Sequence, residues 1–137
     1  MARVAREFGP AAYVERAGGE PTFWCLVNHA AAAILVPGSA DNMPTRAYHQ
    51  LFGLGCCVIS TELLSVLPHY RRWESGVHYL PCRPDYSDAP AQARWCMANP
   101  RAARAIGHAA ACLFAEECSP PAVLAWVEQC MEDYYRG

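Results

Sequence analysis

AILVPGSADNMPTRAYHQLFGLGCCVIS, residues 33–60, is the stretch that decides the fold of this chain. It opens with a short apolar run, 33–37, and closes with a second one, 56–60, and such runs are typical of strands buried on both faces. Between them, Asp41 or Asn42 offers a helix cap. Four residues then share one face of the helix: Ala47, Tyr48, Leu51 and Phe52. The stretch therefore predicts strand, helix and strand, a βαβ unit.

The loop between the first strand and the helix, residues 38–45, is the expected place for a ligand. In βαβ units, ligands bind beyond the carboxyl ends of the strands. Backbone N–H groups and the positive end of the helix dipole face an anion there. We therefore expect any anion site of this protein to lie at this loop.

The composition is that of a globular protein and excludes several functions. The 137 residues are 53% hydrophobic and 18% charged, as expected for a single domain over residues 1–137. The net charge of -2 argues against a nucleic-acid partner, because proteins that bind phosphate backbones carry a basic excess. The sequence holds no lysine, which excludes Schiff-base chemistry and a P-loop lysine.

Cysteine usage and apolar runs bear on redox state and membrane association. Of the eight cysteines, none forms a CxxC motif or a zinc-type Cys/His set. We expect mostly buried, reduced thiols, with disulfides in an oxidising compartment as the alternative. Cys56 and Cys57 are adjacent on a predicted strand, so their side chains should point to opposite faces. No run approaches the roughly 20 apolar residues of a membrane span, and no signal peptide is expected.

The rest of the chain predicts a third strand, 77–81, and further helices. Two helices, 10–17 and 21–32, precede the quoted stretch. Three follow, with start signals at Ser87-Asp88, Asn99-Pro100 and Ser119-Pro120-Pro121. Their apolar stripes are Ala91, Trp95 and Ala98; Ala103, Ile106, Ala110 and Leu113; and Val123, Val127, Cys130 and Tyr134. The predicted fold class is α/β, with a small parallel three-stranded Rossmann-like sheet flanked by helices and a helical C-terminus.

Three runs carry a resemblance to a known family. They are PTRAYHQLFGLGCCVIS at 44–60, GVHYLPCRPDYSDAPAQARWCMANPRAARAIGHAAACLFAEE at 76–117, and EDYYRG at 132–137. Together they resemble the end of glycosyltransferase family 90, the capsule-associated and protein O-glucosyltransferase group. The first run is also similar to exostosin-type and group 1 glycosyltransferases. The likeness covers 24–135, which corresponds to the last third to half of such an enzyme.

The resemblance implies the C-terminal, donor-binding half of a GT-B fold, and transfer of a hexosyl or pentosyl group from a UDP-sugar to a hydroxyl acceptor. Arg46 matches the family's arginine that contacts the donor diphosphate, with Thr45 and Asn42 beside it. Glu62 and Ser39 are candidates for contact with the ribose or sugar of the donor. No metal and no separate cofactor is expected, because an arginine fork and a helix N-terminus together can stabilise a departing diphosphate.

Arg46 also has a simpler interpretation, as an ion pair with Asp41 or Glu62. Against it, a cation in the first turn of a helix meets the positive end of the dipole, which is unfavourable unless an anion is shared there. The catalytic residues stay unassigned, because we find no paired carboxylates and no nucleophile with a plausible base.

A second function is open on the sequence alone. A non-catalytic nucleotide- or partner-binding module, either an orphan half or a pseudoenzyme, explains the short chain equally well. Such a module would expose apolar surface where an N-terminal half or a partner chain belongs. We further expect that the chain alone does not transfer sugar, because the family's general base would lie in a portion before Pro21.

Overall fold

The computed structural model describes residues 25, 27, 29–36, 46–63 and 73–136. Within them the protein is an α/β fold with a three-stranded parallel sheet. The strands lie in the order β1 (Ala33–Ile34), β2 (Val58–Ser60) and β3 (Leu80–Pro81). Ile59 of the central strand pairs with Ile34 on one side and with Leu80 on the other. The prediction of three neighbouring parallel strands is confirmed.

Some predicted segments cannot be followed in the structure. The helix 10–17 and the ligand loop 38–45 lie outside the described residues. Of the predicted helix 21–32, the described residues Cys25, Val27 and His29 are helical.

The strands are shorter than predicted, and β3 shows why. Its expected first residues, Val77 and His78, lie in a turn, in which both backbone N–H groups donate to the carbonyl oxygen of Glu74, at 3.3 and 2.9 Å. Gly76 enables this turn with a φ of 81°, which a residue with a side chain adopts only under strain. Val77 is therefore exposed, and β3 begins at Leu80.

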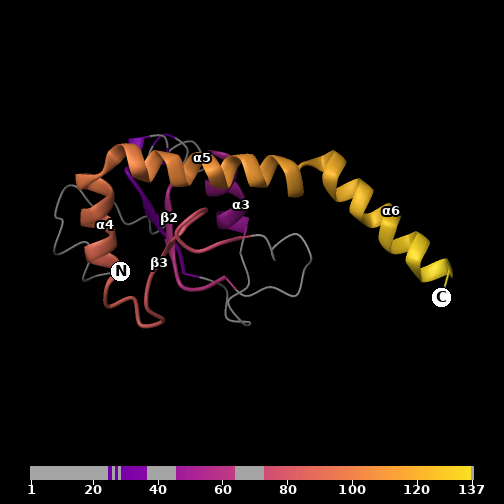
Figure 1. Cartoon of the computed structure of the whole chain (residues 1–137), viewed down its shortest axis with the longest axis horizontal. Coiled ribbons are helices and arrows are strands. Elements are labelled where there is room, and N and C mark those ends of the chain that lie inside the picture. Colours follow the sequence, from indigo (N-terminus) through magenta and orange to yellow (C-terminus); the bar gives the residue numbers. More distant parts are fainter. Residues whose placement is uncertain (1–24, 26, 28, 37–45, 64–72, 137) are drawn as a thin grey trace.

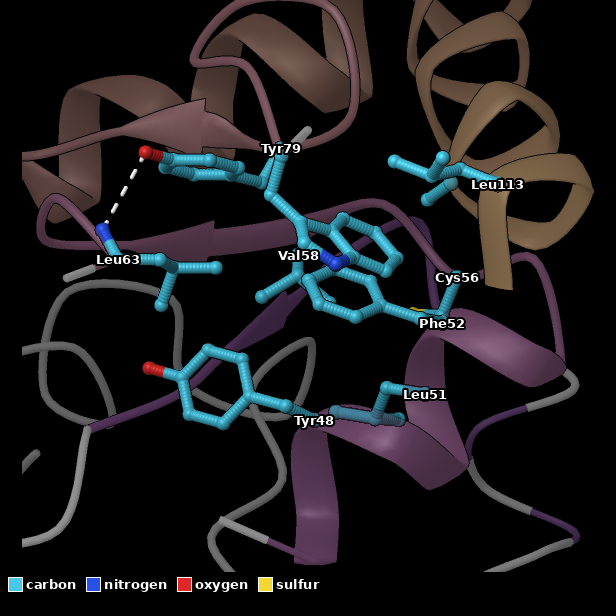
Figure 2. Close-up of a cluster of buried hydrophobic side chains, with 10 residues drawn as sticks. Tyr48, Leu51, Phe52, Cys56, Val58, Leu63, Tyr79 and Leu113 are labelled. Atoms are coloured by element: carbon cyan, nitrogen blue, oxygen red, sulfur yellow. Dashed lines mark hydrogen bonds between the residues drawn. The ribbon is translucent and has the colours of Figure 1, made fainter. Parts of the chain in front are cut away.

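Helix α3 (Arg46–Gly53) covers one side of the sheet, which we call the aromatic face. Tyr48, Leu51 and Phe52 of the helix are each at most 1% exposed, as their predicted shared face requires. They pack with Val58 of β2, and the Phe52 ring stacks on Trp73 with centroids 4.1 Å apart. Figure 2 shows these side chains gathered between α3 and the sheet. This cluster is the larger part of the core.

Helix α4 (Ala89–Ala98) covers the opposite side, which we call the cysteine face. The buried side chains of the cysteine face, which come from several elements, are mostly small: Cys57, Ile59, Leu80, Cys82, Ala89, Cys96 and Ala103. The stripe predicted for α4 is wrong, because Ala91, Trp95 and Ala98 are exposed whereas Cys96 is fully buried. The segment APAQARWCMA is apolar nearly all round, so its spacing does not select one face.

Helix α5 (Pro100–Glu117) crosses the sheet near the amino end of β2 and joins the two faces. Ala103 packs in the cysteine face, whereas Ala110 and Leu113 pack in the aromatic face, so the predicted stripe of α5 is confirmed. The crossing is close because Gly107 has no side chain. A Cβ at this position would overlap the carbonyl oxygen of Gly55 and lie 2.8 Å from its carbonyl carbon.

Helix α6 (Pro120–Arg136) extends away from the rest of the protein, as Figure 1 shows, with the C-terminus at its far end. The predicted helix is confirmed, but none of its described residues is buried. Cys130, expected among the buried thiols, is exposed. Among the helices that the structure describes, none is long and apolar enough to cross a membrane.

Candidate functional site

Polar side chains gather at the carboxyl edge of the sheet, where the three strands end. The hydroxyl of Tyr48, from α3, lies 2.6 Å from the Ser60 Oγ at the end of β2. The same phenol donates to the carbonyl oxygen of Leu35, just past β1, at 3.3 Å. Because that carbonyl only accepts, Ser60 is the donor in the bond to Tyr48. One phenol thus holds the ends of β1 and β2 together.

Tyr86, from the turn between β3 and α4, closes the edge from the other side. Its hydroxyl donates to the same Leu35 carbonyl at 2.8 Å, so the turn after β3 reaches across to β1. Its φ of 57° is the left-handed conformation, which is uncommon for a bulky residue and costs energy that the surroundings must offset. Residues held in this way cluster at functional sites, and this one stands on the edge where ligands of parallel sheets bind.

Both phenols are protonated at neutral pH. Burial raises the pKa of Tyr48, against the opposing effect of the hydrogen bond with Ser60. Burial also raises the pKa of Tyr86, although nearby Thr61 and Ser60 favour its ionised form. The edge therefore presents neutral donors and acceptors in fixed positions rather than a titrating acid or base.

Two buried hydroxyl groups at this edge are poorly bonded: Thr61 Oγ1 lies near the Tyr86 phenol, and Ser87 Oγ lies near the Asp85 carboxylate. Among the described residues, neither Thr61 Oγ1 nor Ser87 Oγ makes a well-formed hydrogen bond. Thr61 follows β2 directly and is 4% exposed, and Ser87 follows Tyr86. A buried hydroxyl that bonds to nothing costs about 1–3 kcal/mol, so natural proteins seldom keep one without a water, an ion or a ligand to satisfy it.

The turn that carries Tyr86 and Ser87 is built by its aspartates. Asp85 accepts a hydrogen bond from the Ser87 backbone N–H at 3.0 Å, and this bond lowers the pKa of the Asp85 carboxyl. Asp88 accepts from the Arg83 N–H at 2.8 Å instead of capping α4 with its side chain. Both carboxylates therefore have structural roles in the turn.

The residues predicted for donor binding are placed only in part. Arg46 is the first residue of α3, so its backbone lies at the helix end that follows the loop after β1. Thr45, Asn42 and Ser39 lie outside the described residues. Glu62 is exposed, two residues past the end of β2 and directly after Thr61. The structure brings Glu62 to the carboxyl edge and leaves the role of Arg46 a prediction.

A cavity of about 220 Å³ lies at the opposite, amino end of the strands. Cys56, Cys57 and Gly55 line it on the side of β2, and Arg104 of α5 is its charged member. Sites for drug-sized ligands usually measure about 300–1,000 Å³ and combine several polar groups. This amino-edge cavity is smaller than such a site, and the carboxyl edge, where ligands of parallel sheets bind, is the better candidate for a nucleotide-sized ligand.

Two polar residues of this edge were recognisable from the sequence but were not among the predicted site residues. Ser60 is the last residue of β2 and Thr61 follows it directly, and a polar residue at the end of a parallel strand points to a ligand. The structural role of Tyr86 had no local signal, because a left-handed tyrosine does not follow from composition.

Within the described residues, no group of three or more His, Cys, Asp or Glu side chains could hold a metal ion.

Comparison of the chain with protein-family models, with curated proteins and with solved structures gave no match. The features of this chain that bear on its function are therefore the geometry of the carboxyl edge and the family resemblance of the sequence.

Proposed function

We propose that this protein binds the diphosphate of a nucleotide sugar, most simply a UDP-sugar, at the carboxyl edge of its sheet. In this proposal it is the donor-binding half of a glycosyltransferase. The observation that carries the proposal is the combination at one edge of the start of α3 and the buried, poorly bonded hydroxyl of Thr61. The first offers the positive end of a helix dipole to an anion, and the second needs a polar partner.

The electrostatics of α3 favour an anion at its start. The first turn of α3 contains no acidic residue, and Arg46 occupies its first position. A cation there is disfavoured by the helix dipole, whereas a bound diphosphate interacts favourably with both the dipole and the guanidinium. This explains an arginine at a position where helices usually prefer an acid.

The hydroxyl groups suit the sugar side of such a ligand. Thr61 and Ser87 make no well-formed hydrogen bond among the described residues, and the adjacent Glu62 carboxylate is exposed. Ribose and hexose hydroxyls both donate and accept, so they can satisfy such groups. Tyr48 and Tyr86 fix the ends of β1 and β2 through Leu35 and so keep the edge in shape before a ligand arrives.

The exposed apolar face of α6 supports a protein that works together with another domain or a partner chain. Six of its exposed side chains are large and apolar: Val123, Leu124, Val127, Met131, Tyr134 and Tyr135. Isolated exposed apolar residues are normal, but a stripe along one helix indicates an interaction surface. The stripe is equally compatible with a non-catalytic module that binds a nucleotide and a partner chain, which is the second candidate function.

Calorimetric titration of UDP tests the binding proposal. Arg46→Ala should weaken binding about 10- to 100-fold, because each charge-assisted bond contributes about 1.5–3 kcal/mol and 1.4 kcal/mol is a factor of ten. Arg101→Ala is the matched control, since Arg101 is also in the first turn of a helix but belongs to α5. Equal affinity in the wild type and Arg46→Ala would mean that Arg46 is only a structural ion pair.

Thr61→Val sharpens the same test because it should act in opposite directions on stability and binding. The valine keeps the shape and removes a buried, poorly bonded hydroxyl, so the free protein should melt at a higher temperature. UDP-sugar affinity should fall because the ligand loses a hydrogen bond. A drop in melting temperature of the free protein would show that Thr61 already has a partner.

Incubation with labelled nucleotide sugars and a panel of acceptors separates the two candidate functions. We expect no transfer by the chain alone, because a GT-B reaction needs a second half to supply the general base and exclude water. Transfer that appears when an N-terminal half is supplied supports the glycosyltransferase. UDP binding without transfer in either case supports the non-catalytic module.

A further inference from the structure

The cysteine face holds two thiols that nearly touch. Cys57 directly precedes β2, Cys96 belongs to α4, and their Sγ atoms lie 3.9 Å apart. Both side chains are buried, Cys57 at 3% exposure and Cys96 at 0%. Cys96 is the residue through which α4 packs most deeply against the sheet, so this pair stands at the contact between the two elements.

We propose that Cys57 and Cys96 are an oxidisable pair that forms a disulfide between β2 and α4. The sulfurs of a disulfide are about 2.05 Å apart, so the two must approach by roughly 2 Å. Rotations of the two side chains toward each other can supply much of that approach. The buried cluster that contains the pair includes the small residues Ala89 and Ala103. Cys56, the buried thiol next to Cys57 in the chain, packs in the aromatic face and is excluded as a partner.

The hydrogen bond between the two thiols makes them unequal. Donation from Cys57 lowers the pKa of Cys96, whereas the same bond and burial raise the pKa of Cys57. Cys96 therefore ionises first. Burial raises the pKa of Cys82, the third thiol of this face, to about 11, so Cys82 ionises less readily than Cys96.

The amino-edge cavity supplies access for a small oxidant. Cys57 is among its lining residues, and its 220 Å³ exceed by several-fold the roughly 30 Å³ of a water molecule. Hydrogen peroxide is of that size. In the reaction the two thiols lose two electrons and two protons, the O–O bond of the peroxide breaks, the S–S bond forms, and two waters leave. The usual route passes through a sulfenic acid on one sulfur, which the other thiolate attacks.

Peptide mapping of the peroxide-treated, folded protein tests the pair. Trypsin should release residues 47–71, which contain Cys56 and Cys57, and residues 95–101, which contain Cys96. The experiment uses full-length protein in which the four cysteines that are not buried, Cys25, Cys112, Cys118 and Cys130, are changed to serine. We expect the two peptides to appear as one disulfide-linked species, whose mass is the sum of the two peptide masses less two hydrogens. Cys56→Ser and Cys82→Ser should keep the link, and Cys57→Ser should abolish it.

Thermal unfolding supplies a second measurement. The disulfide closes a loop between positions 39 residues apart, which restricts the unfolded chain, so the oxidised protein should melt about 5 °C or more above the reduced one. Two outcomes would overturn the proposal: a link that joins Cys82 to Cys96, or oxygen addition to single cysteines without a link. Neither measurement involves a nucleotide, so the result is independent of the proposed function.

Discussion

Helices α5 and α6 follow each other in the chain and have nearly equal lengths, 18 and 17 residues, yet they differ completely in packing. Both carry apolar residues at helical spacing on one side. In α5 that side is buried against the sheet and α3, whereas in α6 no described residue is buried. Figure 1 shows α5 lying along the body of the protein and α6 leaving it. An amphipathic pattern therefore shows that a helix has a face to cover, not that this chain covers it.

The two apolar faces also differ in the sizes of their side chains. The buried face of α5 is made of Ala103, Gly107, Ala110 and Leu113, so the helix approaches the backbone before β2 closely. The apolar face of α6 consists of larger residues, such as Leu124 at 63% exposure and Met131 at 53%. The small residues of α5, Gly107 above all, allow its close approach to the backbone at this crossing.

The largest effect is expected from Gly107→Ala. The new methyl group would overlap the carbonyl oxygen of Gly55 and crowd its carbonyl carbon. Because both are backbone atoms and cannot rotate aside, α5 must move away from β2. We expect a loss of about 3 kcal/mol or more in the free energy of unfolding, well above the gain of about 1 kcal/mol from replacing a helical glycine. Urea denaturation followed by circular dichroism measures it.

Gly53→Ala is the matched control for this substitution. A Cβ at Gly53 would contact the ring of Phe114 at 3.1 Å, and a side chain can move by the small distance needed. The stability should change by no more than about 1 kcal/mol in either direction. Similar losses in both variants would mean that the close crossing at Gly107 does not hold α5 in place.

A smaller and more direct contrast comes from two leucine-to-alanine substitutions. Leu113→Ala, on α5, removes a side chain that is 4% exposed within the aromatic face and should cost about 2–4 kcal/mol. Leu124→Ala, on α6, should cost less than about 0.5 kcal/mol. Both are measured by urea denaturation at several protein concentrations. A loss at Leu124 that matches the loss at Leu113 would show that the α6 face is covered in solution.

The smallest effect is expected at the end of α6. Arg136 and Glu132 form an ion pair at 2.9 Å, one turn apart and both largely exposed. Pairs of this kind stabilise a helix by about 0.2–0.5 kcal/mol and are screened by salt. Arg136→Ala should lower the helical signal slightly at low ionic strength and not at all in 1 M salt. A cooperative loss of stability would mean that α6 is integral to the folded body.

The sequence by itself determined the order of elements and the direction of the strands. Apolar runs at 33–37 and 56–60, separated by a helix-length segment, leave only a parallel crossover, and the structure has it. The helix starts at Pro100 and Pro120 also followed from local chemistry, because proline fits the first turn, where no N–H bond is lost. These features depend on a few neighbouring residues, and for that reason they were predictable.

Only the tertiary structure decided which helical faces are covered and which polar groups meet. The buried face of α4 turned out to carry Cys96 rather than Trp95, because alanines on every side gave the spacing no preference. The meeting of Tyr48 and Tyr86 at the Leu35 carbonyl joins residues up to 51 positions apart. Such contacts depend on where the sheet brings distant segments together, and this information is absent from any local pattern. The outline of the fold is therefore a property of short stretches, whereas the carboxyl edge and the cysteine pair exist only in the folded chain.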